Sequence, residues 1–273
     1  MNGKERLQAT LSHRQPDRVC VDIGGTWVTG MHVSVVDKLR KAVLGDQEYR
    51  VRVVEPYQML GEIDDQLRAA LGIDVVGRGS RKSLFGTDER DWKPFTLFDG
   101  TEVLVPHNLN MTVDEATGDL LAYPEGDTSV PPSVRMPKGG YFFDAIVRQP
   151  PIDEANLNPD DNCEEFGLLS EEDVAHFRKA RQWFEARSEF GAVAVIPGTA
   201  FGDIALVPAP FLKHPKGIRD IQEWYISTAM RPDYVKAVFE KQCEFGLKNI
   251  ETLIEILGDA VQVVVITGTD FGT

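Results

Sequence analysis

Cysteine is scarce in this sequence, with only three among 273 residues. Cys20, Cys163 and Cys243 lie far apart and form no paired motif of the Cys-x-x-Cys type. Isolated thiols of this kind build neither a disulfide framework nor a zinc-ligand cluster, and they are typical of proteins from a reducing compartment. We therefore predict a cytoplasmic protein whose cysteines are small core residues or surface thiols.

Basic residues are also few, because 29 Lys and Arg face 43 Asp and Glu, which gives a net charge of -14. Binding to nucleic acid or to an anionic membrane surface requires a basic face, so neither partner is expected. No apolar run is long enough to cross a membrane, and the polar opening MNGKERLQATLSH lacks the apolar core of a signal peptide. An acidic chain can still bind an anionic substrate at a local cluster of arginines.

What the sequence does contain is an alternation of helical and strand patterns. Apolar residues three and four positions apart predict helices, and short β-branched runs predict strands. The expected helices are Gly3–Leu11, His32–Val43, Tyr57–Leu71, Ala175–Glu189, Ile218–Met230 and Asp233–Leu257. The expected strands are Val19–Ile23, Ile73–Val76, Gly191–Ile196, Ile204–Val207 and Val261–Ile266. Ser170 and Asp173 resemble a capping box at the start of a helix.

The stretch 80–162 interrupts this alternation. It carries Asp-Gly, Gly-Asp, Glu-Gly and Pro-Pro turn pairs between short apolar segments, and it predicts a hairpin around Asp99–Gly100. We interpret it as an antiparallel, β-rich insertion within a single domain that spans 1–273. Helices alternating with apolar strands predict an α/β fold with a parallel sheet. An eight-stranded (β/α)8 barrel takes about 250 residues without insertions, so we expect an incomplete TIM barrel that lacks its C-terminal part.

Six segments, in this order, carry a resemblance to a known family: ERLQATLSHRQPDRVCVDIGGTWVTGMH, LGIDVVGRG, MPKGGYFFD, GDIALVPAPFLKHPKGIRD, RPDYVKAVFEKQ and TGTDFGT. Together they resemble the uroporphyrinogen decarboxylase superfamily, specifically its decarboxylase-like and corrinoid methyltransferase branch. The resemblance covers nearly the whole chain and corresponds to the N-terminal two-thirds of the family. It implies a distorted (β/α)8 barrel with its active site at the C-terminal ends of the strands.

The resemblance also implies a reaction. In methyltransferase members, a His-x-Cys pair and a later cysteine bind zinc, which activates a thiol acceptor, and a corrinoid protein supplies the methyl group. This sequence contains no His-x-Cys, so zinc is expected only with the missing C-terminal part and no metal ligand is assigned here. The decarboxylase's Arg-Gln-Ala-Gly-Arg motif is replaced by Asp22-Ile23-Gly24-Gly25-Thr26, which favours methyl transfer. The expected partners are a small-molecule substrate, a corrinoid protein and a second copy of the chain in a homodimer.

Three residues are candidates for catalysis. Asp22 ends a predicted strand, and it would form the floor of the site or, alternatively, only close a tight turn. His32 opens a predicted helix, where it could act as an acid or base or simply pack on the barrel rim. Asp270 follows the last apolar strand, where barrel catalytic residues lie, although a turn aspartate beside Gly272 is the alternative.

Five residues are candidates for substrate binding. Gly24, Gly25 and Thr26 would expose backbone amides at the end of a strand. Arg78, with Arg81 nearby, follows the second strand and could bind a carboxylate or phosphate, or belong to a surface cluster. His214 lies on a long loop between lysines, and it could contact an anion or only face solvent.

Three other functions stay open. Decarboxylation of a carboxylated tetrapyrrole needs arginine-bound carboxylates and a carboxylate general acid. The segment VDIGGTWVTG resembles the phosphate-binding turn of actin-like sugar kinases, but that turn should link two strands, and here a helix is expected. A non-catalytic binding protein is the fourth alternative, since an open barrel would expose a sheet edge.

Overall fold

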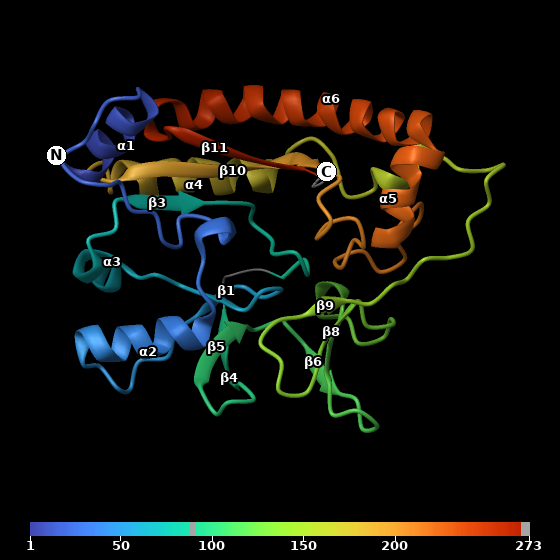
Figure 1. Ribbon diagram of the computed structural model, residues 1–273, viewed down its shortest axis with the longest axis horizontal. Coiled ribbons are helices and arrows are strands. Elements are labelled where there is room, and N and C mark those ends of the chain that lie inside the picture. The colour runs from blue at the N-terminus through green and yellow to red at the C-terminus, as the bar shows by residue number, and fades with distance from the viewer. Residues whose placement is uncertain (88–90, 269–273) are drawn as a thin grey trace.

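The computed structural model describes residues 1–87 and 91–268, and at its centre is a parallel sheet of three strands. They are β3 (Val75–Arg78), β10 (Gly191–Phe201) and β11 (Val263–Gly268), in the order β11–β10–β3 (Figure 1). The three strands thus lie in the sheet in the order in which they occur in the chain, and both neighbouring pairs are parallel. The α/β class is confirmed, and the described strands do not close into a barrel.

Two long helices, α4 (Glu171–Glu185) and α6 (Pro232–Leu257), cover one face of this sheet. Ala192, Ala194 and Ile196 of β10 pack there against Phe177 of α4 and Leu253 of α6. Because β10 is buried between two strands, it consists of a continuous apolar run rather than an alternating one. The predicted capping box at Ser170 and Asp173 is present at the start of α4.

The N-terminal helix α1 (Gly3–Leu11) is joined to β3 by a buried carboxylate. Asp74, 2 % exposed, accepts hydrogen bonds from the guanidinium groups of Arg6 and Arg18 and from the backbone N–H of Val21. The predicted strand at Val19–Ile23 is therefore wrong. The carbonyl oxygen of Val21 accepts the backbone N–H of Asp74, and the side chain of Asp74 takes the place of the next backbone partner by accepting the Val21 N–H.

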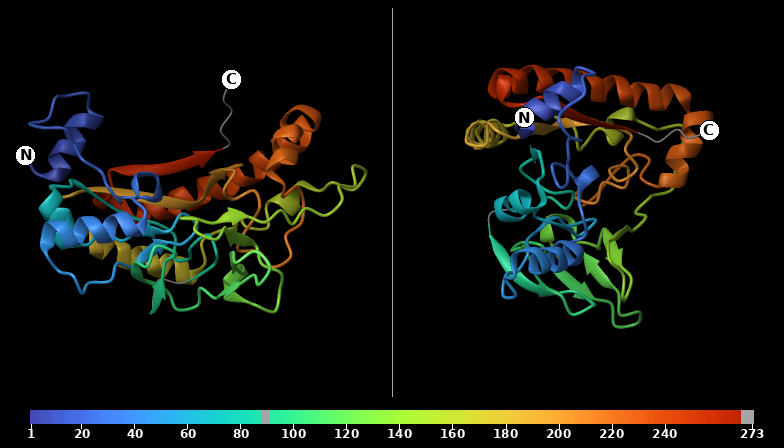
Figure 2. Two further views of the ribbon diagram at one scale, coloured as in Figure 1. Left: turned by 60° about the horizontal axis from the view of Figure 1, so that its bottom comes forward. Right: turned by 60° about the vertical axis from the view of Figure 1, so that its left-hand side comes forward.

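The opposite end of the molecule, which we call the antiparallel part, is built from short elements around another core. The parallel sheet with its helices is the α/β part. It contains α2 (Val33–Leu44), α3 (Asp65–Leu71), the pair β1 (Val53–Glu55) and β2 (Leu60–Gly61), and the hairpin β4 (Trp92–Thr96) and β5 (Glu102–Pro106). A four-stranded antiparallel sheet follows, made of β6 (Met111–Val113), β7 (Leu120–Ala122), β8 (Val134–Met136) and β9 (Asp144–Ala145). The right-hand view of Figure 2 shows this part below the parallel sheet and its helices. The predicted hairpin at Asp99–Gly100 is confirmed.

Two further predictions are wrong. The predicted helix Tyr57–Leu71 forms only at α3, because its first residues make a turn and β2. Its leucine spacing fits a helix, but Gly61 and the N-cap Asp64 divide it, and Leu60 packs against Gly30 instead. The predicted strand Ile204–Val207 is a series of turns in which the carbonyl of Asp203 accepts from Leu206 and Val207.

A third cluster of apolar side chains lies beside α5 (Ile221–Met230), where Trp224 and Ile218 are fully buried. The remaining short helices are 3-10 turns at Trp27–Thr29, Pro124–Gly126, Pro159–Asn162 and Gly258–Ala260. Among the helices of residues 1–87 and 91–268, none combines the length and apolar character needed to cross a membrane.

Candidate functional site

The C-terminal edge of the parallel sheet is the first place to look for a site. Because the three strands are parallel, their C-terminal ends point the same way: β10 and β11 end side by side at Phe201 and Gly268, whereas β3 ends at Arg78, level with Ala194 of β10. Ligands of α/β proteins bind outside this edge, on the loops that follow the strands. The loop 202–217 after β10 is the longest of those described.

The turn Asp22–Thr26 lies against β3 at this edge. A Cβ atom at Gly77 would overlap the carbonyl oxygen of Gly25, so only glycine fits there. The amide N–H groups of the turn have internal acceptors: that of Gly25 donates to Oδ1 of Asp22 at 3.0 Å, and that of Gly24 donates to the carbonyl oxygen of Thr29 at 2.9 Å. The Thr26 amide lies 3.4 Å from Oγ1 of Thr29. The predicted amides are thus brought together, and they stabilise the turn itself.

His32 is placed away from this edge, at the start of α2. Its Nδ1 accepts the backbone N–H of Ser34 at 3.2 Å, and its Nε2 lies 2.7 Å from the carbonyl oxygen of Tyr141. The ring therefore caps α2 and carries its proton on Nε2, which donates to the antiparallel part. Beside it lies a small cavity of about 130 Å³ that Tyr141, Gly139 and Phe98 also line.

Arg78 and Arg81 face α4 rather than the strand ends. The Arg78 guanidinium lies 4.3 Å from the ring centroid of Trp183, and Arg187 lies at the same distance from that ring. Arg81 pairs with Glu172 at 3.0 Å and with Asp173 at 3.5 Å, at the N-terminus of α4. Both arginines join β3 to its covering helix in this structure.

The last two predicted residues contribute little to the described geometry. His214 is exposed on the loop 202–217, next to Lys213, which pairs with Asp127 at 2.6 Å. Asp270 lies outside the described residues.

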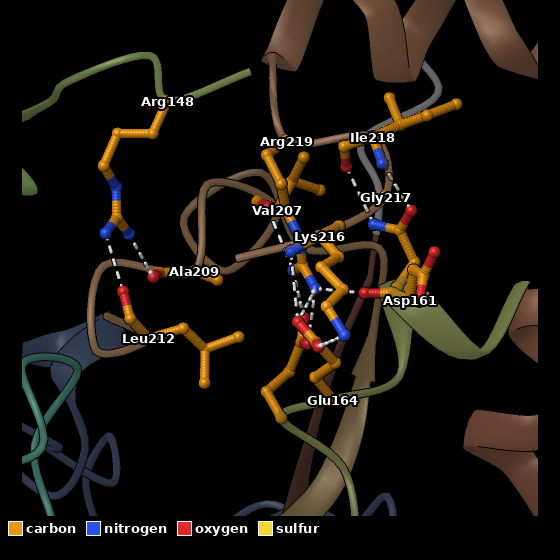
Figure 3. A network of polar contacts seen from close by, with 12 residues as sticks. Arg148, Asp161, Glu164, Val207, Ala209, Leu212, Lys216, Gly217, Ile218 and Arg219 are labelled. Atoms are coloured by element: carbon orange, nitrogen blue, oxygen red, sulfur yellow. Dashed lines mark hydrogen bonds and ion pairs between the residues drawn. The ribbon is translucent and has the colours of Figure 1, made fainter. Parts of the chain in front are cut away.

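Reasoning from the sequence missed the polar cluster that holds the loop 202–217 (Figure 3). Arg219 is fully buried and binds Glu165 through two parallel hydrogen bonds of 2.8 and 3.0 Å. Arg148 donates to the carbonyl oxygens of Leu212 and Ala209, each at 2.6 Å. Desolvation, together with the positive charge of Arg219, lowers the pKa of Arg148 to about 10. The only signal in the sequence was the density of basic residues in FLKHPKGIRD.

Glu55 is a second group that sequence reasoning missed. Its carboxylate accepts the backbone N–H groups of Tyr57 at 3.0 Å and Gln58 at 2.7 Å. Desolvation raises its pKa to about 7, although these two hydrogen bonds oppose the shift. Such a carboxyl is partly protonated at neutral pH, which is the range that a general acid requires.

An apolar groove opens where β10 ends. Phe201, Phe239 and Val235 line it together with the exposed thiol of Cys243, and its volume is about 620 Å³. The rings of Phe201 and Phe239 meet edge to face at 6.4 Å between centroids. The groove lies between the sheet edge, α5 and α6, so it could receive an apolar part of a ligand.

The described residues do not fit a zinc site. Within residues 1–87 and 91–268, no three His, Cys, Asp or Glu side chains gather as a ligand set. Burial raises the pKa of the Cys163 thiol to about 11 and raises that of Cys20, which is opposite to what a thiolate ligand needs. We therefore derive no chemical step through zinc.

Comparison of this chain with protein-family models, with curated proteins and with solved structures gave no match.

Proposed function

We propose that the chain belongs to a cytoplasmic enzyme of the uroporphyrinogen decarboxylase superfamily, in its corrinoid methyltransferase branch. The observation that carries this proposal is the sheet β3–β10–β11, whose neighbours are parallel and follow chain order. Such an order is what an arc of a (β/α)8 barrel requires, whereas a doubly wound sheet reverses its order at a switch point. The helices α4 and α6, which connect these strands and lie on one face, also agree with a barrel wall.

The proposed reaction moves a methyl group from a corrinoid protein to a thiol-type acceptor. The Co–C bond breaks, an S–C bond forms, and the acceptor loses its proton. In this proposal, the Asp22 turn and the loop 202–217 form the rim on which the acceptor lies. The groove at Phe201 and Phe239 would bind its apolar part and exclude water.

The test is an assay with methylcobalamin as the donor and 2-mercaptoethanol as the acceptor, with and without Zn²⁺. We expect the methyl thioether, detected by mass spectrometry, to form faster with protein than in a blank. Replacement Asp22→Ala should slow it, because the turn loses the acceptor of the Gly25 amide, while Glu48→Gln at an exposed position serves as the charge control. A rate equal to the blank under both metal conditions would refute methyl transfer by this chain.

Decarboxylation of a carboxylated tetrapyrrole is the second candidate, and the pKa of Glu55 favours it. A carboxyl with a pKa of about 7 could supply the general acid that protonates the product carbanion. Release of CO₂ from uroporphyrinogen should then fall as pH rises through 7, and Glu55→Gln should abolish it. If CO₂ release is absent in wild-type protein and methyl transfer is absent too, a non-catalytic binding protein becomes the better proposal.

The sugar-kinase alternative loses its structural basis. Residues 19–31 form a turn and the 3-10 helix Trp27–Thr29 before α2, not the strand–turn–strand that the phosphate-binding turn of such kinases needs.

A further inference from the structure

Arg148 holds the loop 202–217 in place without help from an acidic residue. Its Nη1 donates to the carbonyl oxygen of Leu212, and its Nη2 donates to those of Ala209 and Pro208, the latter at 3.3 Å. No carboxylate among residues 1–87 and 91–268 forms an ion pair with it. A positive charge is thus fixed in a partly desolvated place by neutral acceptors alone.

The neighbouring arginine shows what a compensated site looks like in the same chain. Arg219 carries the same charge, and it is paired with Glu165 at 2.8 Å and with Glu164 at 3.8 Å. Buried charges normally require such partners, because removing an ion from water costs several kcal/mol. Acidic residues outnumber basic ones here, so a missing counter-charge at Arg148 is not a consequence of composition.

The guanidinium of Arg148 also has donors to spare. A guanidinium has five N–H groups, and the three carbonyl oxygens leave the Nε–H and one Nη1–H. In the described structure, Nε is buried and has no hydrogen-bond partner. An unmatched buried donor is destabilising, and it adds to the uncompensated charge of this side chain.

The position of Arg148 suits a ligand. Its side chain points toward the loop that carries Ala209 and Leu212, as Figure 3 shows. That loop begins directly after Phe201, at the C-terminal end of β10. The backbone of Ala209 has a positive φ of 47°, which an alanine adopts only under constraint. The loop is therefore held in a strained shape by the same cation that lacks a counter-charge.

We propose that Arg148 and the loop 202–217 form a binding site for a small organic anion, a carboxylate or a phosphate. An oxygen atom of the anion accepts the spare Nη1–H of the guanidinium, and the negative charge compensates the Arg148 cation. The site is independent of the reaction proposed above, because it requires only binding. It also replaces Arg78 as the anion receptor, since that residue is stacked on Trp183.

Binding is measured by isothermal titration calorimetry with succinate and, separately, with inorganic phosphate at constant ionic strength. Replacement Arg148→Gln should weaken binding at least about tenfold, and Arg148→Lys should weaken it less, since the positive charge stays. The matched control is Arg50→Gln, which removes the same charge at the exposed pair with Glu102 and should leave binding unchanged. Circular dichroism of each variant shows whether it is folded.

The two anions distinguish the chemistry of the ligand. Binding of succinate alone supports a carboxylate site, and binding of phosphate alone supports a phosphate site. The proposal is overturned if neither anion binds the wild-type protein at millimolar concentration. It is equally overturned if folded Arg148→Lys and Arg148→Gln bind as tightly as the wild type. None of these outcomes depends on methyl transfer or decarboxylation.

Discussion

Two arginine–carboxylate pairs, one in the α/β part of the molecule and one in the antiparallel part, differ in how far they are buried. In the α/β part, near α5, Arg219 and Glu165 form an ion pair whose side chains are 0 % and 5 % exposed. On the hairpin of the antiparallel part, Arg50 and Glu102 pair at a similar distance but are 45 % and 60 % exposed. The two pairs have similar N–O distances, but their contributions to stability should differ greatly because only the first pair has been removed from water.

Removing one carboxylate from each pair tests most directly whether burial sets the energy of the pair. Glu165→Gln leaves the buried Arg219 cation without its counter-charge and should lower the free energy of unfolding by about 3 to 5 kcal/mol. Glu102→Gln on the hairpin should cost less than about 1 kcal/mol. Urea denaturation of both variants measures the difference. Equal losses would show that burial does not decide the value of these pairs.

Gly77 has no Cβ atom, and this lets the turn at Gly25 lie directly on β3. Gly77→Ala should destabilise the protein by about 3 kcal/mol, since the new methyl group overlaps a backbone carbonyl that cannot move aside cheaply. Gly167→Ala is the control, because a Cβ there meets no atom within 4 Å. A stable Gly77→Ala variant would mean that the turn is not seated on the strand as described.

Glu55 in the antiparallel part predicts a pH dependence that the paired carboxylates do not share. Its pKa is raised to about 7 in the folded protein, above the value of an unfolded chain, so the contribution of this group to stability is largest at acidic pH. Stability should fall by about 2 kcal/mol between pH 4.5 and 7.5, as the unfolded chain ionises first. Glu55→Gln should remove this decline, and Glu48→Gln should not. Parallel pH profiles for Glu55→Gln and wild type would contradict the assignment.

The smallest expected effect concerns the capping box of α4. Ser170→Ala removes the hydroxyl that accepts the Asp173 N–H at 3.2 Å, and it should cost about 1 kcal/mol. Asn2→Ala in the capping box of α1 should cost a similar amount. Thermal unfolding of both variants compares the same motif at a helix that covers the sheet and at the N-terminus. If Ser170→Ala costs much less stability than Asn2→Ala, packing against β10 already fixes the start of α4.

The α/β part was predicted better than the antiparallel part. Runs such as Gly191–Ile196 and the stripe of Asp233–Leu257 are long enough for their periodicity to be unambiguous, and the helix ends at Gly258 as expected. By contrast, Tyr57–Leu71 has the leucine spacing of a helix but is divided between β2 and α3. In short segments the local pattern is weak, and packing against neighbours such as Gly30 decides the structure.

The candidate site was predicted only in part, for a related reason. The turn at Asp22 and the cap at His32 are local motifs, so their positions follow from neighbouring residues. At least sixty residues of the chain separate Arg78 and Arg148 from their partners, and no local sequence pattern predicts these contacts. Consequently the sequence suggested the first arginine as an anion receptor, whereas our proposal of the second depends on contacts that only the structure shows.

The sequence by itself determined the α/β class, the main helices with their caps and the hairpin at Asp99–Gly100, because these depend on periodicity and turn chemistry within a few residues. Only the tertiary structure decided which strands pair, which charges are buried with a partner and which cation has none. The physical reason is that burial and desolvation are properties of the assembled chain. A charged side chain has the same intrinsic chemistry at Arg148 and Arg219, and only its folded surroundings make the two different.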